Sequence, residues 1–495
     1  MTNTLYDALI GPHHDNTAPF LHLGDGTQIT FAAFCARAAQ IAHVLSDHGV
    51  GPRDRIVVQA PKSAEYLALY AAALQTGAVF LPLNTAYTLS EVQYFVDDAD
   101  PALIVCAPDT APDIASLADK RPMLTLDATA TGTLSTAANA APTGFNTVAR
   151  GPDDLAGLLY TSGTTGRSKG AMMSHRNLLS NARALTDLWQ ITHADTLIHA
   201  LPVFHTHGLF VAINTALLAG AQIRFMASFN TDAILHALPR STLMMGVPTF
   251  YTRLLADPRL THEATSNMRL FISGSAPLLA ETHRAFTDRT GHRILERYGM
   301  TETNMITSNP YDGDRVPGTV GHALPGVAVR IRDAGRCTPT GDIGVIEVRG
   351  DNVFQGYWNQ PEKTAEDMTE DGYFITGDLA TMDATGRVTI VGRAKDLIIS
   401  GGYNIYPKEV EDVLNALPSV LESAVIGVPD PDKGEAVVAV IVPTPDGQVT
   451  DADVQAHVSA HLAKFKHPRR YVTMDALPRN TMGKVQKTTL RSDLG

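Results

Sequence analysis

Through roughly the first 330 residues, short apolar runs alternate with amphipathic segments. The segment 31–48 carries apolar residues at helical spacing and is followed by Gly49 and Gly51, which commonly end helices. Short continuous apolar runs between such helices are typical of buried parallel strands. The pattern predicts helices at 31–48 and 63–76 and strands at 55–60, 78–83, 103–106 and 124–126. Such alternation predicts α/β layers with mainly parallel sheets.

The pattern changes at about residue 326. Three segments, 329–332, 344–349 and 386–391, alternate apolar and polar residues between turn residues, which predicts a small β subdomain. The pattern of the last hundred residues predicts a separate structural unit, with helices at 407–417 and 451–462 and strands at 422–428 and 436–442. Residues 127–151 are rich in Ala, Thr and Gly and show little periodicity, so we expect a surface connection there.

Composition excludes several classes of partner. With 39 Lys and Arg against 51 Asp and Glu, the net charge is −12, which is unfavourable for binding nucleic acid. The first residues lack the basic and apolar regions of a signal peptide. The most apolar stretch, 66–83, is interrupted and predicts a buried helix followed by a strand, not a membrane span. The 3 cysteines have neither disulfide nor zinc spacing, so we expect a reduced, cytoplasmic location.

A run of hydroxyl residues, glycines and a lysine occupies 160–170, directly after the apolar segment 155–159. Glycines let the backbone approach a ligand, and backbone N–H groups in such a loop form an anion nest. The spacing is not that of a Walker A loop, so it points away from P-loop kinases and ATPases. We therefore predict a loop that leaves a buried strand and holds the phosphates of a nucleotide. Its expected contacts are Thr161, Ser162, Gly163, Thr164, Thr165, Gly166 and Lys169.

With this loop, further segments at 201–205, 273–277, 298–302, 373–378, 392–396 and 480–484 make the chain resemble the adenylate-forming superfamily, in the family's order. That superfamily includes acyl-CoA synthetases, luciferases and peptide-synthetase adenylation domains. The resemblance covers nearly the whole chain. It implies an α/β fold with a large N-terminal domain over 1–394, made of two α/β layered subdomains and a small β-barrel-like subdomain. A small, mobile α+β C-terminal domain over 395–495 completes it.

The resemblance implies an acid–thiol ligase that uses ATP, Mg²⁺ and coenzyme A. A carboxylate attacks the α-phosphate, pyrophosphate leaves, and a thiol then takes the acyl group from the acyl-AMP. Glu302, with Thr165, is expected to bind Mg²⁺, which prefers one or two carboxylates plus phosphate oxygens. Thr301 is expected at the α-phosphate. The remaining expected ATP contacts are Asp378 and Arg393 at the ribose, Ser275, Ala276, Pro277 and Tyr298 around the adenine, and Arg297, Gly299 and Met300.

The resemblance also implies a mobile catalytic lysine, Lys484, whose ammonium orients the two reactants and stabilises the transition state. The C-terminal domain is expected to rotate about a hinge at Lys395 between the two half-reactions. Gly401, Gly402 and Tyr403 are expected to line the channel for the pantetheine arm. A protein acetyltransferase that neutralises Lys484 is a further expected partner, because loss of that charge would stop adenylation.

Segments 246–253, 273–277, 298–304 and 477–487 most resemble malonyl-CoA synthetases. Malonate keeps a second carboxylate while the first reacts, and burying it unpaired costs several kcal/mol. An arginine grips such a group best. We expect Arg253 in this role, because Pro248 can begin a helix that carries it. His207, Ser273 and Met300 match accessory positions of the acyl pocket.

Three alternatives stay open from the sequence. The acid could be another small acid, such as methylmalonate, acetate or an aryl acid. The chain could load a carrier protein in place of coenzyme A, although no carrier serine motif is visible. It could also be a nucleotide sensor without catalysis, which the presence of Glu302, Asp378 and Lys484 disfavours.

Overall fold

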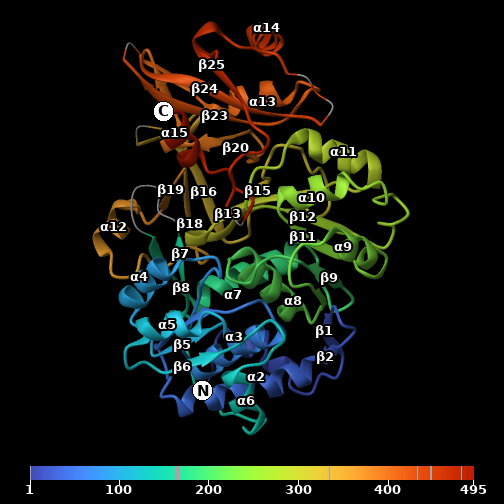
Figure 1. Ribbon diagram of the computed structural model, residues 1–495, viewed down its shortest axis with the longest axis vertical. Coiled ribbons are helices and arrows are strands. Elements are labelled where there is room, and N and C mark those ends of the chain that lie inside the picture. Colours follow the sequence, from blue (N-terminus) through green and yellow to red (C-terminus); the bar gives the residue numbers. More distant parts are fainter. Residues whose placement is uncertain are drawn as a thin grey trace.

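The computed structural model describes residues 2–161, 168–333, 335–431, 433–445, 447, 449–480 and 482–495. The described residues form four β-sheets. Figure 1 shows the N-terminal half of the chain at the bottom and the C-terminal unit at the top. One continuous buried apolar cluster runs through the first two sheets, from Phe80 to Phe271 and beyond. The fold confirms the predicted α/β class with a large N-terminal part and a small C-terminal one.

The first sheet has six strands in the order β6-β5-β3-β4-β7-β8, parallel except for the last pair. Its strands are β3 (Arg55–Gln59), β4 (Val79–Pro82), β5 (Leu103–Cys106), β6 (Met123–Thr125), β7 (Leu155–Thr161) and β8 (Lys169–Ser174). Its helices are α2 (Phe31–Asp47), α3 (Ala64–Thr76), α4 (Leu89–Ala99), α5 (Ala111–Ala118) and α6 (Thr133–Asn139). Ser63 caps α3 by accepting a hydrogen bond from the Tyr66 N–H, and Gly77, with a φ of 77°, ends it.

The second sheet has nine strands in the order β15-β14-β13-β12-β11-β9-β10-β1-β2. They are β1 (Pro19–Leu23), β2 (Gln28–Thr30), β9 (Thr196–His199), β10 (Gln222–Phe225), β11 (Leu243–Gly246), β12 (Leu270–Ser273), β13 (Leu295–Met300), β14 (Asn304–Ser308) and β15 (His322–Ala323). Helices α1 (Tyr6–Leu9), α7 (His175–Leu188), α8 (Asn214–Ala219), α9 (Thr231–Ala237), α10 (Pro248–Leu255) and α11 (Ala280–Thr290) belong to this half. Parallel strands β9 to β13 place their carboxyl ends along one edge, where ligands bind in open α/β sheets.

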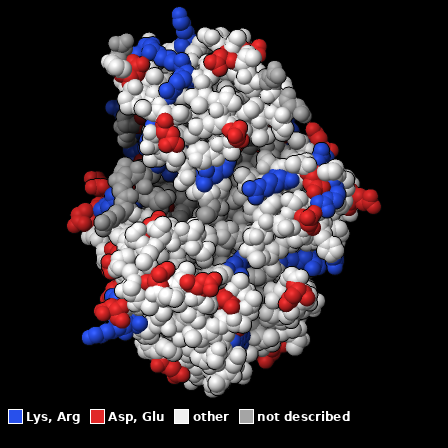
Figure 2. Space-filling view, viewed as in Figure 1, with Lys and Arg blue, Asp and Glu red and all other residues white. Residues whose placement is uncertain are grey.

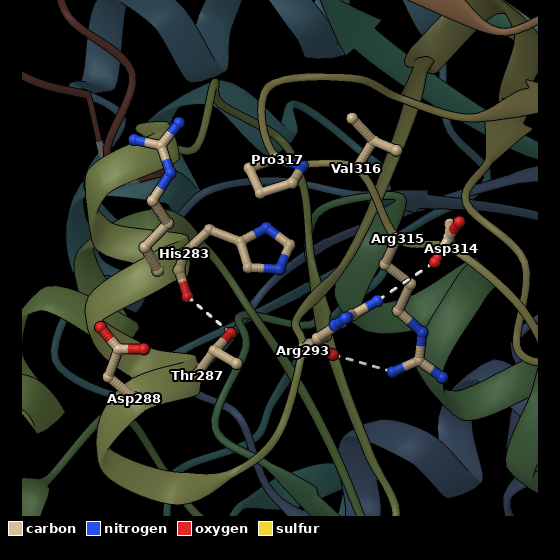
Figure 3. Close-up of a pocket in the computed structure, with 9 residues that line it drawn as sticks. His283, Thr287, Asp288, Arg293, Asp314, Arg315, Val316 and Pro317 are labelled. Atoms are coloured by element: carbon tan, nitrogen blue, oxygen red, sulfur yellow. Dashed lines mark hydrogen bonds and ion pairs between the residues drawn. The ribbon is translucent and has the colours of Figure 1, made fainter.

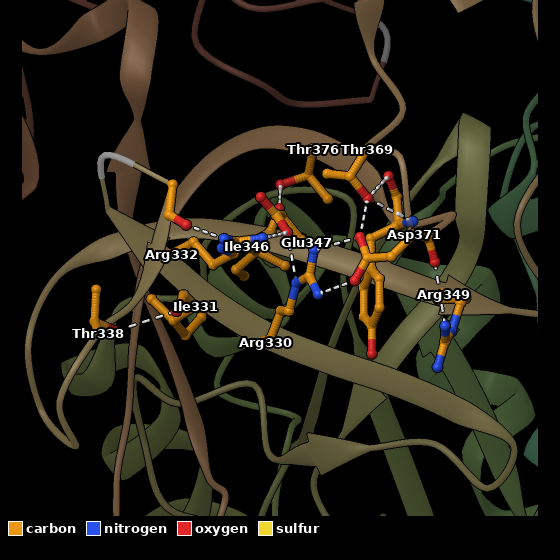
Figure 4. Close-up of polar contacts among 12 residues, drawn as sticks. Arg330, Ile331, Arg332, Thr338, Ile346, Glu347, Arg349, Thr369, Asp371 and Thr376 are labelled. Atoms are coloured by element: carbon orange, nitrogen blue, oxygen red, sulfur yellow. Dashed lines mark hydrogen bonds and ion pairs between the residues drawn. The ribbon is translucent and has the colours of Figure 1, made fainter. Parts of the chain in front are cut away.

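The predicted β subdomain is a five-stranded antiparallel sheet. It comprises β16 (Val327–Asp333), β17 (Arg336–Cys337), β18 (Gly344–Gly350), β19 (Phe374–Met382) and β20 (Val388–Arg393), with α12 (Pro361–Glu366) between β18 and β19. Arg330 ties it together, as Figure 4 shows: its guanidinium bonds Glu347 Oε2 at 2.6 Å and Asp371 Oδ2 at 2.5 Å. Its guanidinium carbon also lies 3.8 Å from the centre of the Tyr373 ring.

The C-terminal sheet begins with β21 at Ile398, five residues after β20 ends at Arg393. It comprises β21 (Ile398–Ser400), β22 (Tyr403–Ile405), β23 (Val420–Asp430), β24 (Gly434–Pro443) and β25 (Arg470–Thr473), with α13 (Pro407–Asn415), α14 (Asp451–His461) and α15 (Lys487–Leu494). The chain changes sheet between β20 and β21, and the domain boundary at 394/395 stays a prediction. Figure 2 shows a hollow between this unit and the rest of the chain, with Lys and Arg side chains at its edges.

One sequence expectation needs correction. Residues 127–151 are not only a connection, because they include α6, whose Leu134 and Ala138 are buried. Their alanines and threonines hid a short helix whose apolar side packs into the core. The first two sheets are mainly parallel, as predicted, although β2, β8 and β14 pair antiparallel with their neighbours. Cys35 and Cys106 are buried free thiols and Cys337 is an exposed one. No helix among the described residues is long and apolar enough to cross a membrane.

Candidate active site

The end of β13 leads directly into the candidate site. Arg297, Tyr298, Gly299 and Met300 close this strand, and Thr301 and Glu302 follow in a 3₁₀ turn, Thr301–Thr303. Beside it, β12 ends at Ser273, and Ser275 has a φ of 70°, an uncommon left-handed conformation for a residue with a side chain. Ala276 is half-buried and Pro277 is exposed. Strand ends from the second sheet therefore supply a large part of the predicted site.

Asp378 and Arg393 come from neighbouring strands of the β subdomain, directly opposite each other in the β19–β20 register. Arg393 Nε lies 3.0 Å from Asp378 Oδ1, and the Tyr298 hydroxyl donates to Asp378 Oδ2 at 2.5 Å. Burial and the adjacent Asp378 carboxylate raise the pKa of Tyr298, so its hydroxyl remains a donor. The structure thus brings together the three residues predicted for the nucleoside end, although each carboxylate oxygen keeps further acceptor capacity for ribose hydroxyls.

Glu302 is a buried carboxylate, and burial raises its pKa. Its Oε1 accepts a hydrogen bond from the Tyr357 hydroxyl at 3.1 Å. No group of three or more His, Cys, Asp or Glu side chains in the described part of the chain could hold a metal by itself. A single buried carboxylate fits Mg²⁺, which takes its remaining ligands from phosphate and water. Glu302 would hold that ion next to the phosphates.

Of the predicted phosphate loop, Thr161 and Lys169 are described, and they face each other across the β7–β8 pair. Ser162, Gly163, Thr164, Thr165 and Gly166 lie outside the described residues. The Lys169 ammonium lies 4.1 Å from the centre of the Tyr357 ring and 3.8 Å from Asp367 Oδ2. Lys169 is therefore held by Tyr357 and Asp367, neither of which was predicted from the sequence.

A buried cation lies behind the β12 end. Arg297 is 4% exposed, and its Nε and Nη2 have no hydrogen-bond partner among the described residues. A Cβ added at Gly274 would lie 2.3 Å from Arg297 Cζ, so only glycine leaves room for the guanidinium. Burial lowers the pKa of Arg297 to about 9. At neutral pH this arginine is a buried, charged group that lacks an anionic partner among the described residues.

Two further buried groups lack a hydrogen-bond partner in the described part of the chain. Ser273 Oγ and His207 Nε2 are buried and have no partner among the described residues. His207 begins a π-helix, His207–Ile213, and its Nδ1 lies 3.2 Å from Ser275 Oγ. Burial and then the Arg297 charge lower the pKa of both His207 and His205, that of His205 to about 4. Both imidazoles are therefore neutral at pH 7.

Arg253 stands apart from this buried group. It is exposed on α10, which begins at Pro248 as expected, and its guanidinium carbon lies 5.5 Å from the centre of the Phe229 ring. Met300 is half-buried against the core. Of the residues predicted for the acid, His207 lies near enough to Arg297 for that charge to lower its pKa, whereas Ser273 is paired with Glu296 in the sheet. The roles of Ser273 and Arg253 stay predictions.

Lys484 is carried to the site by a tight hairpin. The Asn480 side chain accepts hydrogen bonds from the backbone N–H groups of Met482 and Lys484, both at 3.0 Å, and Gly483 has a φ of 73°. Met482 is buried in the apolar cluster of the N-terminal part. A Cβ on Gly483 would lie 3.2 Å from Thr249 Oγ1, on α10. The hairpin is therefore docked against the N-terminal part.

The docked lysine has a depressed pKa. Burial, then the positive charge of Arg393, lower the pKa of Lys484 to about 8, while Asp378 raises it. Lys395, the predicted hinge, lies in the turn Ala394–Asp396, and burial and Arg393 lower its pKa too. Gly401, Gly402 and Tyr403 are exposed on the C-terminal unit, where the Tyr403 ring stacks on Phe465 at 4.6 Å. In this orientation the structure does not bring the predicted channel residues to the site.

We expect adenylation to fall as the pH rises past the pKa of Lys484. Its ammonium is present below about pH 8 and is lost above it. The kcat/KM of acyl-adenylate formation should therefore decline with a midpoint near 8, since this constant reports the free enzyme. When ATP is bound, its negative charge should raise the pKa of Lys484, so kcat should decline at a higher pH than kcat/KM does. ATP–pyrophosphate exchange between pH 6.5 and 10 measures both, and a kcat/KM that is flat throughout would contradict the role of this ammonium.

A separate cavity of about 360 Å³ lies between α11 and the loop 314–317 (Figure 3). His283 faces it, and its Nδ1 lies 3.2 Å from Glu296 Oε1. Glu296 precedes Arg297 on β13, so the two side chains point to opposite faces of the sheet. The cavity therefore lies behind the candidate site and is not part of it.

Comparison with known proteins gives a consistent result. The family model for the AMP-binding enzyme matches residues 10–358, and that for the AMP-binding enzyme C-terminal domain matches 409–484. The structure is similar to ATP-bound MatB from Rhodopseudomonas palustris at 53% identity, with a TM-score of 0.98 over 100% of this chain and 99% of that one.

Two curated relatives differ in their acids. The chain is 36% identical to a feruloyl-CoA synthase from Amycolatopsis over 95% of both chains. It is 35% identical to a malonate–CoA ligase from Arabidopsis thaliana, covering 89% of this chain and 78% of the relative. Identity at this level therefore does not select the acid, and the residues of the acyl site must do so.

Proposed function

The chain belongs to the AMP-binding enzyme family and is an AMP-forming acid–CoA ligase, and from this premise we propose that its acid is malonate. The reaction converts ATP, malonate and coenzyme A into AMP, diphosphate and malonyl-CoA through malonyl-AMP. One observation carries the choice of acid: among the described residues the buried guanidinium of Arg297 has no partner for Nε and Nη2, and its charge acts on the neighbouring His207, whose Nε2 also lacks a partner. This differs from the ATP contact that the resemblance implied for Arg297.

Malonate supplies what this group lacks. A buried charge is tolerated when it is paired, and an arginine fork binds a carboxylate with two parallel hydrogen bonds. The distal carboxylate of malonate would pair with Arg297, while neutral His207 can donate to it through Nε2. An aryl or unsubstituted aliphatic acid would leave the guanidinium unpaired in a buried site. The pocket thus favours a small dicarboxylate over the acids of the aromatic relatives.

The proposed first half-reaction uses the groups around the strand ends. A malonate oxygen attacks the α-phosphorus of ATP and the bond to pyrophosphate breaks. Lys169 restrains the leaving phosphates, Thr301 lies at the turn next to the reacting phosphate, and Asp378 holds the ribose. The Lys484 ammonium stabilises the charge that develops between acid and phosphate. A Mg²⁺ held by Glu302 would neutralise charge on the departing phosphates.

For the second half-reaction we propose that residues 395–495 rotate about Lys395. The sulfur of coenzyme A then attacks the acyl carbon of malonyl-AMP, the bond from that carbon to the phosphate oxygen breaks, and AMP leaves. The rotation would bring Gly401, Gly402 and Tyr403, now exposed, to the acyl-AMP. The present orientation, with Lys484 docked, corresponds to the first step. The cytoplasmic location and the acetylation of Lys484 stay predictions.

Pyrophosphate release with a panel of acids, with and without coenzyme A, tests the proposal. Malonate should give the highest specificity constant, and coenzyme A should be needed for turnover. Methylmalonate should be weaker if the pocket is tight around the central carbon. Fast turnover with acetate or an aryl acid, and little with malonate, would contradict the assignment. Release that stays slow with coenzyme A and accelerates with a pantetheinylated carrier protein would favour carrier loading.

The Arg253→Ala variant separates the two arginines. Arg253 is exposed and Arg297 is buried, so we expect Arg253→Ala to reduce malonate kcat/KM by about tenfold, as for an exposed charge that guides and contacts the acid. ATP binding should be unchanged. Steady-state kinetics with malonate varied at saturating ATP measure this. Unchanged malonate kinetics would remove Arg253 from the acyl site, with Arg259→Ala, at another exposed arginine nearby in the sequence, as the matched control.

A further inference from the structure

The segment 355–358 lies alongside β8, the outgoing arm of the phosphate loop. The Gln355 N–H donates to the Met172 carbonyl at 2.9 Å and the Met172 N–H donates to the Gly356 carbonyl at 3.0 Å. The Trp358 N–H donates to the Gly170 carbonyl at 2.7 Å. These bonds make the segment an antiparallel extension of the sheet that carries Lys169. Tyr357, in its middle, is thereby fixed relative to β8, which carries Lys169.

Tyr357 contacts both charged halves of the phosphate site. Its ring lies under the Lys169 ammonium at 4.1 Å, and its hydroxyl donates to Glu302 Oε1 at 3.1 Å. The side chain is 3% exposed and packs edge-on against Phe354, with the ring centres 4.8 Å apart. The Phe354 N–H in turn donates to the Glu302 carbonyl at 2.8 Å. Backbone and side chain of this segment therefore both hold the turn that bears Glu302.

The ion pair of Lys169 is weak enough to be exchanged. Its ammonium lies 3.8 Å from Asp367 Oδ2, beyond hydrogen-bond distance. Asp367 Oδ1 is also engaged by Lys363, at 2.9 Å. The face of the Tyr357 ring, with its centre 4.1 Å from the ammonium, is a second support for Lys169. Incoming phosphate can thus draw Lys169 from Asp367 while the ring continues to define where the ammonium lies.

We propose that Tyr357 is the positioning residue that joins the two halves of the phosphate site. Its ring holds the Lys169 ammonium for the terminal phosphates, and its hydroxyl fixes the Glu302 carboxylate for Mg²⁺. The second function rests on the proposed Mg²⁺ role of Glu302, and the first does not. A core tyrosine with a merely structural role would need only its ring, whereas here the hydroxyl bonds a group that faces the ligand.

Two variants separate ring from hydroxyl. Tyr357→Phe removes the hydroxyl and with it the hydrogen bond to Glu302, and Tyr357→Leu also removes the aromatic face under Lys169. Tyr66→Phe is the matched control, since Tyr66 is also buried and its hydroxyl has no hydrogen-bond partner among the described residues. Isothermal titration calorimetry measures the Kd of ATP with Mg²⁺ and of ATP in excess EDTA, without any acid present. The result is therefore independent of whether malonate is the acid.

We expect Tyr357→Phe to weaken MgATP binding about tenfold while metal-free ATP binds as in the wild type, because a hydrogen bond to a charged group is lost. Tyr357→Leu should weaken metal-free ATP as well, by about threefold. Equal MgATP affinity of wild type and Tyr357→Phe would overturn the function of the hydroxyl. Equal metal-free affinity of wild type and Tyr357→Leu would overturn that of the ring. If Tyr357→Phe lost the same fraction of its ATP affinity with and without Mg²⁺, the hydroxyl would serve packing alone, and this result would also overturn the proposal.

Discussion

Replacing Lys484 with alanine is expected to abolish acyl-adenylate formation and to leave thioester formation from supplied malonyl-AMP largely intact. The ammonium lies in a half-buried position between Arg393 and Asp378, where a single charge has large effects on a developing anion. Removing one such preorganised donor typically lowers the rate by about 10²- to 10³-fold. In the proposed second half-reaction, by contrast, the C-terminal unit has rotated and this lysine has left the site.

Single-turnover measurements of the two half-reactions provide the test. Malonyl-AMP formation is followed by pyrophosphate release, and malonyl-CoA formation is followed after addition of malonyl-AMP and coenzyme A. Lys487→Ala is the control, because Lys487 belongs to the same tail but pairs with Glu411 at 2.6 Å. If Lys484→Ala slowed both half-reactions equally, the proposed division between two orientations would be wrong.

The sequence predicts the layered architecture well because its signals are local. Apolar periodicity and terminal residues placed α2 and α3 almost to their observed ends, since Ser63 caps α3 and Gly77 ends it. The α6 helix was missed because its alanines and threonines resemble a loop and its stability comes from burying Leu134 and Ala138. Strands β1 and β2 join a sheet whose nearest strand, β10, lies some 200 residues later, a pairing that no local pattern encodes.

The candidate site was predictable to the extent that charged residues occur in recognisable segments. Asp378, Tyr298 and Arg393 are brought together as expected. Tyr357 was missed because its importance comes from lying beside β8, which ends at Ser174, more than 180 residues earlier in the sequence. The buried state of Arg297 was equally hidden, because it depends on the space that Gly274 leaves and on the absence of partners.

The docked lysine hairpin shows why orientation lies beyond sequence reasoning. Lys484 was predicted from its motif, but its docking depends on Met482 entering the N-terminal core and on Gly483 lying close to Thr249. Both contacts join segments more than two hundred residues apart. A sequence can encode two such orientations at once, and only three-dimensional packing shows which one is occupied.

Replacing Arg297 with methionine should convert a dicarboxylate pocket into an apolar one. Methionine is unbranched and fits a site that already lies against Gly274. The distal carboxylate of malonate would then be buried without a cation, which costs about 3–5 kcal/mol and predicts a 10²- to 10³-fold lower kcat/KM for malonate. Propionate, which carries a methyl group in place of that carboxylate, should become the better substrate of the two.

Three measurements decide what Arg297 does. Pyrophosphate release compares malonate with propionate, and calorimetry compares ATP affinity in variant and wild type. Thermal unfolding without acid should occur at a temperature no lower than that of the wild type, because the variant removes an unpaired buried charge. Weakened ATP binding with an unchanged preference for malonate would instead place Arg297 in the nucleotide site, as the family resemblance first implied. A switch towards propionate with intact ATP binding would establish that this one guanidinium selects the acid.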